Sequence, residues 1–389
     1  MAALDDVRIL DLSRLLPGPF ATLLLADLGA DVIKIEDTDV GDYLRWMPPM
    51  AGEYSAMFHA LNRNKRSVAL NLKTDSGRAA FLDLVAAADV VVESFRPGVL
   101  DRLGLGYAAL SARNERIVLC SISGYGQDGP YRGRAGHDLN YASLAGVMSI
   151  GGADAGLPAM PALQVGDLGA GALHAVVAIL AALHERQRSG RGQHCDVAML
   201  DGLVGWMSPH AAAYFATGDV PQAGSLTLNG RYPCYRMYRC ADGAVSVAAL
   251  EPKFWSALVA ALGLPHLDGA AFAEGAEGDR VAAELQHALL ARSRAEVAAL
   301  GDGGDVCCEP VLSVGEVFAH PQVVARDMLL EPGVAGPLAQ CACPIRMGEG
   351  PAEVRRHAPG WGADTRDLLQ EAGYDATTID ALASNGVIR

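Results

Sequence analysis

Three residues of this chain are of the types that move protons or attack carbonyl carbons. The first is Asp167, in Val165-Gly166-Asp167-Leu168-Gly169, immediately before an apolar stretch that predicts a helix. The flanking glycines allow a ligand to approach closely, and a carboxylate beside a helix start lies next to oriented backbone N–H groups. Such a carboxylate can act as a nucleophile or a general base. The structural alternative is that Asp167 only caps the helix.

His137 and Glu251 are the other two candidates. His137, in Gly136-His137-Asp138-Leu139-Asn140-Tyr141, follows a loop rich in Gly and Arg and precedes a helical segment. A histidine exchanges protons near neutral pH, and Asp138 could orient its ring; equally, His137 could be an ordinary hydrogen-bonded loop residue and Asp138 a helix cap. Glu251 lies where a predicted strand passes into a helix, so capping or a solvated charge is its alternative role.

Basic residues gather near the ends of predicted strands in an otherwise acidic chain. They are Arg63, Lys65, Arg66, Lys73, Arg96 and Arg102. The alternatives are a solvated face and an anion site, for which phosphate is the natural ligand. The formal net charge of −14 opposes generic binding to nucleic acid or to an anionic membrane. Any anionic ligand must therefore find a local basic patch.

Motifs of several other protein classes are missing. No GxGxxG follows the first predicted strand, no GxxxxGK[ST] occurs, and GxSxG is absent. The eight cysteines form no CxxC pair and have no histidine at zinc-finger spacing. They predict reduced thiols in the cytoplasm and no metal site.

The elements that must position the candidate residues alternate between strand and helix over roughly the first 185 residues. Short β-branched runs predict strands at 7–12, 32–35, 68–70, 90–92 and 117–122. Helical patterns lie between them, for example at 20–28 and 76–87. This alternation predicts an α/β fold with a Rossmann-like parallel sheet, on which ligands lie at the carboxyl ends of the strands.

The rest of the chain predicts a helical segment, a linker and a smaller α+β domain. Residues 188–193 predict a break, 198–217 a helical segment and 218–233 a linker. A hairpin is predicted at 235–249, followed by helices near 253–262, 279–291 and 294–300. We expect a large domain over 1–217, completed by 330–389, and a small domain over 234–329.

Location is predicted from the ends and from the most apolar stretch. The N-terminus lacks the basic and apolar regions of a signal peptide, and the C-terminus is not a peroxisomal address. The apolar stretch 168–183 is shorter than the ~20 residues that span a bilayer. We expect a cytoplasmic protein with no membrane or nucleic-acid partner.

Several ordered segments together resemble the family III CoA-transferase superfamily and, within it, the α-methylacyl-CoA racemases. The segments are 23–36, 63–73, 93–99, 123–130, 136–138, 165–167, 189–193 and 310–312. The Asp of Gly166-Asp167 is shared by the superfamily, whereas Gly136-His137-Asp138 and Glu251 are typical of the racemase branch. One difference is Glu36-Asp37, where the racemase pattern often has a basic residue that bears on the CoA nucleotide.

The resemblance implies a fold, a reaction and a set of contacts. The reaction is epimerisation at the α-carbon of a 2-methyl-branched acyl-CoA, with Asp167 on one face and His137, balanced by Glu251, on the other. Donors at the helix start after Asp167 would hold the enolate oxygen. The fold is an interlocked homodimer, and no metal or cofactor is needed beyond the CoA of the substrate. The CoA contacts implied are Leu70, Asn71, Leu72, Lys73, Ser94, Phe95, Arg96, Arg102, Gly136, Asp138, Leu139, Asn140 and Tyr141.

Two other functions remain open at this point. In a family III CoA-transferase, Asp167 would attack the thioester to form an anhydride and then an aspartyl-CoA thioester, with no required role for His137 or Glu251. The glycine-rich loop of formyl-CoA transferases is missing, since Leu228-Asn229-Gly230-Arg231 occupies that region. A non-catalytic acyl-CoA-binding protein is the third hypothesis.

Overall fold

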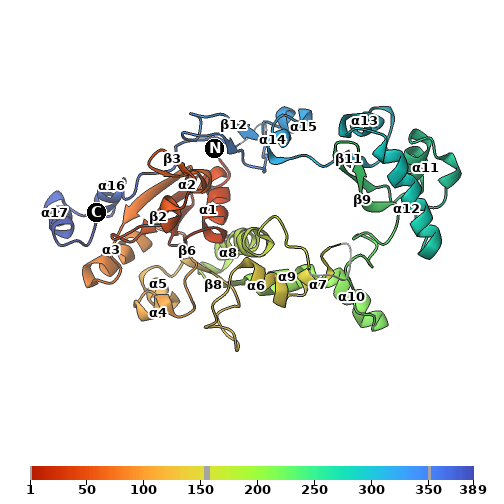
Figure 1. Cartoon of the computed structure of the whole chain (residues 1–389). Helices are drawn as coiled ribbons and strands as arrows, with labels where there is room; N and C mark the ends of the chain where they lie inside the picture. The colour runs from red at the N-terminus through yellow and green to blue at the C-terminus, as the bar shows by residue number, and fades with distance from the viewer. Residues whose placement is uncertain (1, 153–157, 349–351) are drawn as a thin grey trace. The chain divides into compact units, whose positions relative to one another are not determined.

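The structure is a computed structural model that describes residues 2–152, 158–348 and 352–389. The chain divides into two compact units (Figure 1). Unit 1 contains Met1–Ala145, Ala162–Trp206 and Pro321–Arg389, and unit 2 contains Gly146–Pro161 and Met207–His320. The domain boundaries expected at 217 and 234 stay predictions.

Unit 1 is built on a parallel sheet of six strands, which confirms the predicted α/β class. In spatial order the strands are β5 (Lys65–Ala69), β2 (Asp31–Glu36), β1 (Arg8–Asp11), β6 (Val90–Glu93), β7 (Val118–Ser123) and β8 (His194–Ala198). All neighbouring pairs are parallel. Five strands fall on predicted runs. The sixth, β8, was not predicted because its first three residues are exposed or half-buried, so this edge strand lacks an apolar run.

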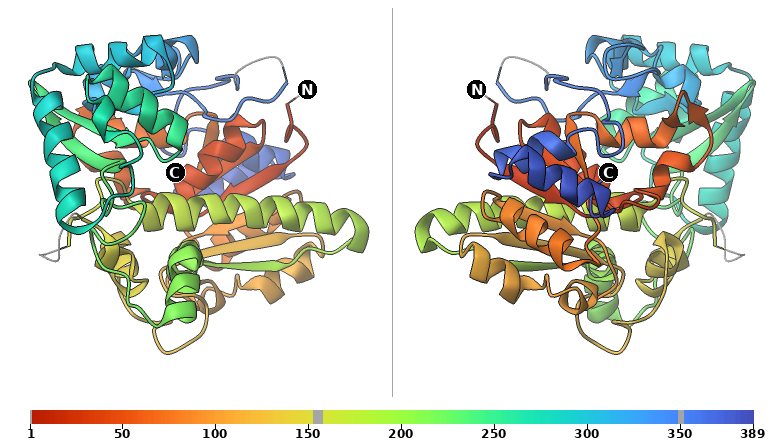
Figure 2. Two further views of the ribbon diagram at one scale, coloured as in Figure 1. Left: turned by 90° about the vertical axis from the view of Figure 1, so that its right-hand side faces the viewer. Right: turned by 90° about the vertical axis from the view of Figure 1, so that its left-hand side faces the viewer.

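Helices cover both faces of this sheet (Figure 2). On one face α1 (Pro17–Asp27) packs against α8 (His174–Ser189), which also contacts β7 and β8. The other face holds the main core, formed with α3 (Asp75–Val85), α4 (Val99–Arg102), α5 (Tyr107–Arg113), α16 (Thr365–Glu371) and α17 (Ala376–Ser384). Leu368 and Ile379, near the end of the chain, are buried in the same core as Phe81.

The strand order reverses between β1 and β6. At such a switch point the loops at the carboxyl ends of the two strands diverge and leave a crevice for a ligand. The backbone N–H of Arg14, after β1, donates to Ser94 Oγ, after β6, at 3.3 Å. The topology therefore predicts a binding site beside these two loops.

The helix after Asp167 is longer than predicted. A π-helical segment, η2 (Val165–Leu173), leads directly into α8, and together they form a helical run of 25 residues. By length and composition alone this run could cross a membrane, which corrects the expectation that the apolar stretch is too short. Half of its most apolar window is buried within the protein, and the core helix of a soluble protein has the same character.

Unit 2 contains the predicted hairpin and helices. Strands β9 (Tyr235–Cys240) and β10 (Gly243–Ala248) form an antiparallel hairpin, to which β11 (Cys308–Pro310) adds a third strand. The helices α11 (Pro252–Ala261), α12 (Gly275–Leu290) and α13 (Arg294–Ala298) enclose a core around Trp255. The predicted helical segment 198–217 is two helices, α9 (Met199–Trp206) in unit 1 and α10 (Ser208–Thr217) in unit 2.

The remaining elements are short. They are β3 (Met50–Ala51), β4 (Tyr54–Ser55), α2 (Ala56–Asn62), α6 (Asp138–Leu144), α7 (Val147–Ile150), α14 (Val314–Val317), α15 (Pro321–Ala325), β12 (Leu329–Leu330) and β13 (Gln340–Cys341).

Candidate active site

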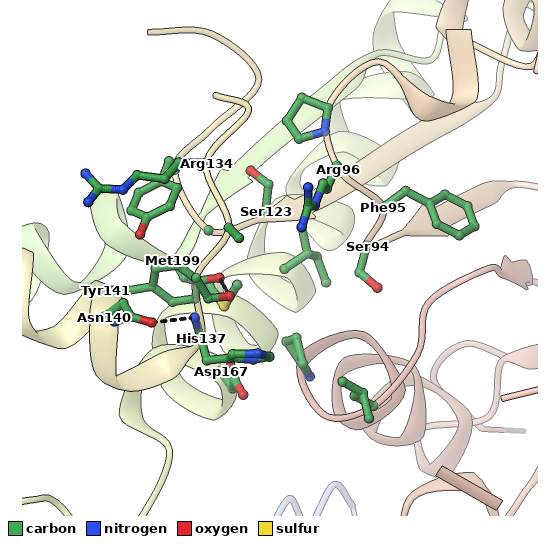
Figure 3. A pocket seen from close by; sticks show the side chains of 18 of the residues that line it. Ser94, Phe95, Arg96, Ser123, Arg134, His137, Asn140, Tyr141, Asp167 and Met199 are labelled. Atoms are coloured by element: carbon green, nitrogen blue, oxygen red, sulfur yellow. Dashed lines mark hydrogen bonds between the residues drawn. The ribbon is translucent and has the colours of Figure 1, made fainter. Parts of the chain in front are cut away.

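A cavity of about 570 Å³ opens at the carboxyl ends of β1, β6 and β7 in unit 1 (Figure 3). Its walls come from the loops after these strands, from the start of α6 and from η2. We call it the first cavity. The predicted site residues that line it are Ser94, Phe95, Arg96, Gly136, His137, Asn140, Tyr141 and Asp167. In Figure 3 the ring of His137 lies next to the carboxylate of Asp167.

Asp167 is held by contacts that differ from a helix cap. The residue at the N-cap of η2 is Gln164, so the capping interpretation of Asp167 is wrong. The N–H of Asp167 donates to Asp138 Oδ1 at 2.9 Å, and the N–H of Leu168 donates to the Gln164 carbonyl at 2.9 Å. These two N–H groups are occupied within the protein, so an enolate oxygen would need other donors of this helix start. Single π-helical turns are frequent at functional sites.

Gly166 is required for this arrangement. A Cβ atom on Gly166 would lie 2.9 Å from Asp138 Oδ1, a separation that real Cβ atoms essentially never show. A larger residue would therefore displace the Asp138 carboxylate from the N–H of Asp167. The sequence suggested that Gly166 lets a ligand approach closely, whereas in the structure Gly166 makes room for the Asp138 side chain.

The surroundings of Asp167 shift its titration. Burial and the nearby Asp138 carboxylate raise the pKa of Asp167, His137 opposes both effects, and the resulting pKa is about 6. The group is mostly ionised at neutral pH, yet it can be protonated at modest cost. A carboxyl group poised in this way suits either a nucleophile or a general base.

His137 and Tyr141 are two further neighbours of the Asp167 carboxylate in the first cavity. His137 is exposed and precedes α6, and its backbone N–H donates to Asn140 Oδ1 at 3.0 Å. The Tyr141 hydroxyl donates to the Gly136 carbonyl. Burial, reinforced by Asp167, raises the pKa of Tyr141 to about 12, so the phenol stays protonated.

A second cavity, of about 510 Å³, shares Arg14 and Phe95 with the first. It is lined by the predicted residues Leu70, Asn71, Leu72 and Lys73 and by Asp37. Most of the predicted CoA contacts thus line one of two cavities that share Arg14 and Phe95. Two adjoining cavities suit a ligand that is extended.

Four predicted residues line neither cavity. Asp138 accepts the backbone N–H of Asp167, and Leu139 is exposed on α6. A Cβ on Gly98 would be 3.6 Å from Arg102 Nη1 and 3.3 Å from Arg132 Nη2, so both guanidinium groups reach this glycine. Glu251 belongs to unit 2, where it is exposed before α11. Its contact with His137 stays a prediction.

Several arginines of the site were not predicted. Arg14 lines both cavities, its Nη2 donates to Asp37 Oδ2 at 3.0 Å, and its Cζ lies 5.8 Å from the centre of the Phe95 ring. Its position after the first strand of a parallel sheet was the available signal. Arg132 and Arg134 also line the first cavity. Among the described residues, Arg96, Arg132 and Arg134 have no carboxylate within ion-pair distance.

The Glu36-Asp37 pair has a structural explanation. Glu36 is buried and accepts hydrogen bonds from Arg45 Nη2 at 2.6 Å and Nε at 2.8 Å. Asp37 pairs with Arg14 and accepts the backbone N–H groups of residues 39–41. Both charges are therefore compensated inside the protein. Within the described part of the chain, no group of three or more His, Cys, Asp or Glu side chains could hold a metal ion.

The family model for CoA-transferase family III matches residues 4–365. The chain belongs to this family. A crystal structure of a CAIB/BAIF family protein from Brucella suis has a TM-score of 0.84 and 33% identity, and it covers 95% of this chain and 99% of that one. This agreement places the six-stranded fold within the family III fold.

Relatives of this chain include both CoA-transferases and a racemase. A succinyl-CoA:mesaconate CoA-transferase of Haloarcula marismortui is 37% identical, over 97% of this chain and 98% of that protein. An alpha-methylacyl-CoA racemase of Mus musculus is 32% identical, over 99% and 97%. The chain is thus an enzyme of the family III CoA-transferase and racemase superfamily. The racemase branch predicted above is not confirmed, since the transferase has the higher identity.

Proposed function

We propose that this protein transfers CoA between carboxylic acids through Asp167. The observation that carries the proposal is a mostly ionised carboxylate in a cavity with three arginines that have no carboxylate partner among the described residues. The CoA-transferases among its relatives support it. We favour this transfer over racemisation, which the sequence motifs favoured.

The proposed reaction begins with Asp167. Its carboxylate attacks the thioester carbonyl carbon, the C–S bond breaks, and a mixed anhydride and CoA thiolate form. The thiolate then attacks the Asp167 carbonyl carbon and releases the first acid, which leaves an aspartyl-CoA thioester. The acceptor carboxylate attacks the carbonyl carbon of this thioester, so the C–S bond breaks and a second mixed anhydride and CoA thiolate form. The thiolate then attacks the acceptor's carbonyl carbon in the anhydride and gives the acceptor's CoA ester. Asp167 is regenerated as a carboxylate.

The acids are expected to be short and dicarboxylic. The Haloarcula relative is named for succinyl-CoA, which carries a free carboxylate beside its thioester, and for mesaconate, which has two carboxylates. In this chain Arg96, Arg132 and Arg134 supply cationic side chains in the first cavity. Guanidinium groups recognise carboxylates by paired hydrogen bonds. Some of these arginines would bind CoA phosphates and others the free carboxylate.

A second candidate, α-carbon racemisation, is favoured by one observation. His137 lies next to Asp167, and the charge of its ring lowers the pKa of that carboxyl. Two bases on opposite sides of one carbon are what inversion requires. The mouse racemase among the relatives supports this function as well.

We also propose a homodimer in the cytoplasm. Helix α10 contributes no buried residue to its unit, and its Tyr214 and Phe215 are 42% and 80% exposed. Large exposed aromatic side chains of this kind favour a protein partner. Light scattering would measure the mass of the assembly in solution.

One experiment separates the two enzyme functions. Wild-type protein and His137→Ala are incubated with succinyl-CoA and an acceptor acid, and separately with one enantiomer of a 2-methylacyl-CoA in deuterated water. A transferase forms the acceptor's CoA ester and keeps this activity in His137→Ala. Inversion with α-deuterium and no transfer, abolished in His137→Ala, would establish the racemase instead.

A further inference from the structure

Glu93 is a buried acid that neither proposed reaction uses. It ends β6, is 4% exposed and directly precedes the loop 94–97, whose residues line the first cavity. Its Oε2 accepts the backbone N–H of Phe95 at 2.7 Å. Because Phe95 belongs to the wall between the two cavities, this hydrogen bond fixes the loop at a point that both cavities share.

Two polar side chains lie between Glu93 and the protein surface. Ser121 is the neighbour of Glu93 on β7, is 2% exposed, and its hydroxyl lowers the pKa of the Glu93 carboxyl. Ser121 Oγ also lies 2.9 Å from His194 Nε2 on β8. His194 is exposed, and its ring stacks on Tyr107 with centroids 5.9 Å apart. Ser121 and His194 thus lie between the buried acid and solvent.

The hydroxyl of Ser121 allows two arrangements, because it has one hydrogen to donate. With Glu93 ionised, Ser121 donates to the carboxylate and accepts from a protonated His194 Nε2. With Glu93 protonated, the carboxyl donates to Ser121 Oγ, and the hydroxyl donates to an unprotonated Nε2. In both cases one Glu93 oxygen stays free to accept the N–H of Phe95.

We propose that Glu93 is a positioning residue of the acyl-CoA site and takes up a proton, through Ser121 and His194, when an anionic ligand binds to the neighbouring loop. The inference rests on the proposed function only in that CoA binds to this loop. The proton neutralises the Glu93 carboxylate, so no second negative charge lies beside the anionic ligand. The hydrogen bond from the Phe95 N–H to Glu93 is retained.

The charges around Glu93 favour this behaviour. Burial, with the negative charges of Asp196 on β8 and Asp101 on α4, raises the pKa of Glu93 to about 7, although Ser121 and the Phe95 N–H favour the ionised form. The Cys120 thiol on β7 is a further neighbour, and the charge of Glu93 raises the pKa of that thiol. Burial lowers the pKa of His194. A bound anion adds to the negative charge of these neighbours, so it favours the protonated acid.

The test is isothermal titration of the protein with CoA at about pH 7.5 in two buffers, Tris and HEPES, whose ionisation enthalpies differ. The difference in observed enthalpy gives the number of protons taken up on binding. We expect roughly half a proton for wild type. Glu93→Gln, whose amide oxygen can still accept the Phe95 N–H, should bind CoA and lose most of this uptake.

Asp167→Asn is the matched control, because Asp167 is the other carboxyl of the site with a raised pKa. It should retain most of the uptake. The proposal is overturned if wild type takes up no proton, if Glu93→Gln takes up as many as wild type, or if Asp167→Asn alone abolishes the uptake. An active Asp167→Asn enzyme would instead refute the proposed transfer and leave the proton measurement intact.

Further variants keep the test decisive if Glu93→Gln does not fold. Ser121→Ala removes a hydrogen bond that favours the ionised acid, so Glu93 should already be protonated and uptake should again be lost. Glu93→Ala leaves the Phe95 N–H unpaired and should raise the KM for acyl-CoA about tenfold with little change in kcat. Glu93→Gln should restore that KM, whereas a Glu93 whose role is only structural would change KM and kcat alike.

Discussion

The buried side of the sheet at β1, β2 and β5 and the first cavity contain the same types of charged side chain, but only the first of these regions pairs all of them. Around β1, β2 and β5 lies a buried ion cluster whose members are each at most 3% exposed: Asp11, Lys34, Glu36, Asp42, Arg45 and Lys65. Its members are paired: Lys65 Nζ is 3.2 Å from Asp11 Oδ2, Lys34 Nζ is 2.8 Å from Asp42 Oδ2, and Arg45 donates to both oxygens of Glu36. In the first cavity, three arginines find no carboxylate among the described residues.

The contrast is sharpest between two aspartates. Burial raises the pKa of Asp11, but the adjacent Lys65 and Lys34 outweigh it, and the net shift is downward. Burial raises the pKa of Asp167 too, and there Asp138 adds to the increase while only His137 opposes it. A charge that is neutralised within the fold specifies structure, whereas a charge left without a partner is available to a ligand or a reaction.

The largest effect is expected from Asp167→Asn. The amide cannot attack a thioester or accept a proton, so turnover should fall by at least roughly 10²-fold. The backbone hydrogen bond to Asp138 does not involve the changed side chain, so the fold and CoA binding should persist. Steady-state kinetics and titration with CoA measure the two properties.

Asp219→Asn, at an exposed site in unit 2, is the matched control and should leave turnover unchanged. A folded Asp167→Asn protein with near-normal turnover would show that the cavity is not the active site.

Breaking the buried ion cluster should instead affect stability. Asp11→Ala leaves Lys65 buried without its carboxylate, and loss of one partner of a buried pair typically costs about 3–5 kcal/mol. We expect the free energy of unfolding to fall by about this amount in urea titrations. A loss below 1 kcal/mol would mean that the cluster is not the stabilising element that its pairing suggests.

Arg132→Ala should have the converse effect. Its guanidinium group has no carboxylate partner in the described structure, so the free energy of unfolding should change by no more than about 0.5 kcal/mol. The KM for acyl-CoA should rise roughly tenfold with kcat nearly constant, since remote phosphate contacts bind ground and transition states alike. Arg239→Ala, exposed on β9, is the control. Equal KM values for both variants would assign Arg132 to a solvated face.

The smallest effect concerns pH and Glu93. Its pKa is raised to about 7 from the model-peptide value of 4.5, so its contribution to stability is full below pH 4.5 and is lost as the pH rises through 7. Glu93→Gln does not ionise and should gain about 1–2 kcal/mol over wild type between pH 5 and pH 8. Parallel pH dependences of unfolding for the two proteins would contradict this expectation.

The sheet was predictable because most of its strands are buried on both faces. Continuous β-branched runs such as Val90, Val91 and Val92 then mark the strands directly. Strand β8 was not predicted, because an edge strand needs no such run. The π-helical geometry at Asp167 was not predicted either, since it depends on side chains that pack against the glycines of η2, such as Trp206 against Gly169.

The site was predictable where the chemistry is local. The motifs around His137 and Asp167 named residues that the structure brings to one cavity. Arg14 was missed because its place in the site depends on strand order, which one sequence does not reveal. The hydrogen bond from the Asp167 N–H was missed for a similar reason, since its acceptor, Asp138, lies 29 positions earlier in the chain.

The end of the chain has a consequence for synthesis. Ile388 forms a β-bridge with Leu70, the Asn71 N–H donates to the Val387 carbonyl, and Leu368 and Ile379 complete the core over Phe81. Chains emerge from the ribosome N-terminus first. The segment around Leu70 and Asn71, which lines the second cavity, therefore completes its hydrogen bonds only after residues 387 and 388 have been synthesised. Until residues 368 and 379 have also emerged, the apolar side chains around Phe81 lack part of the core that covers them.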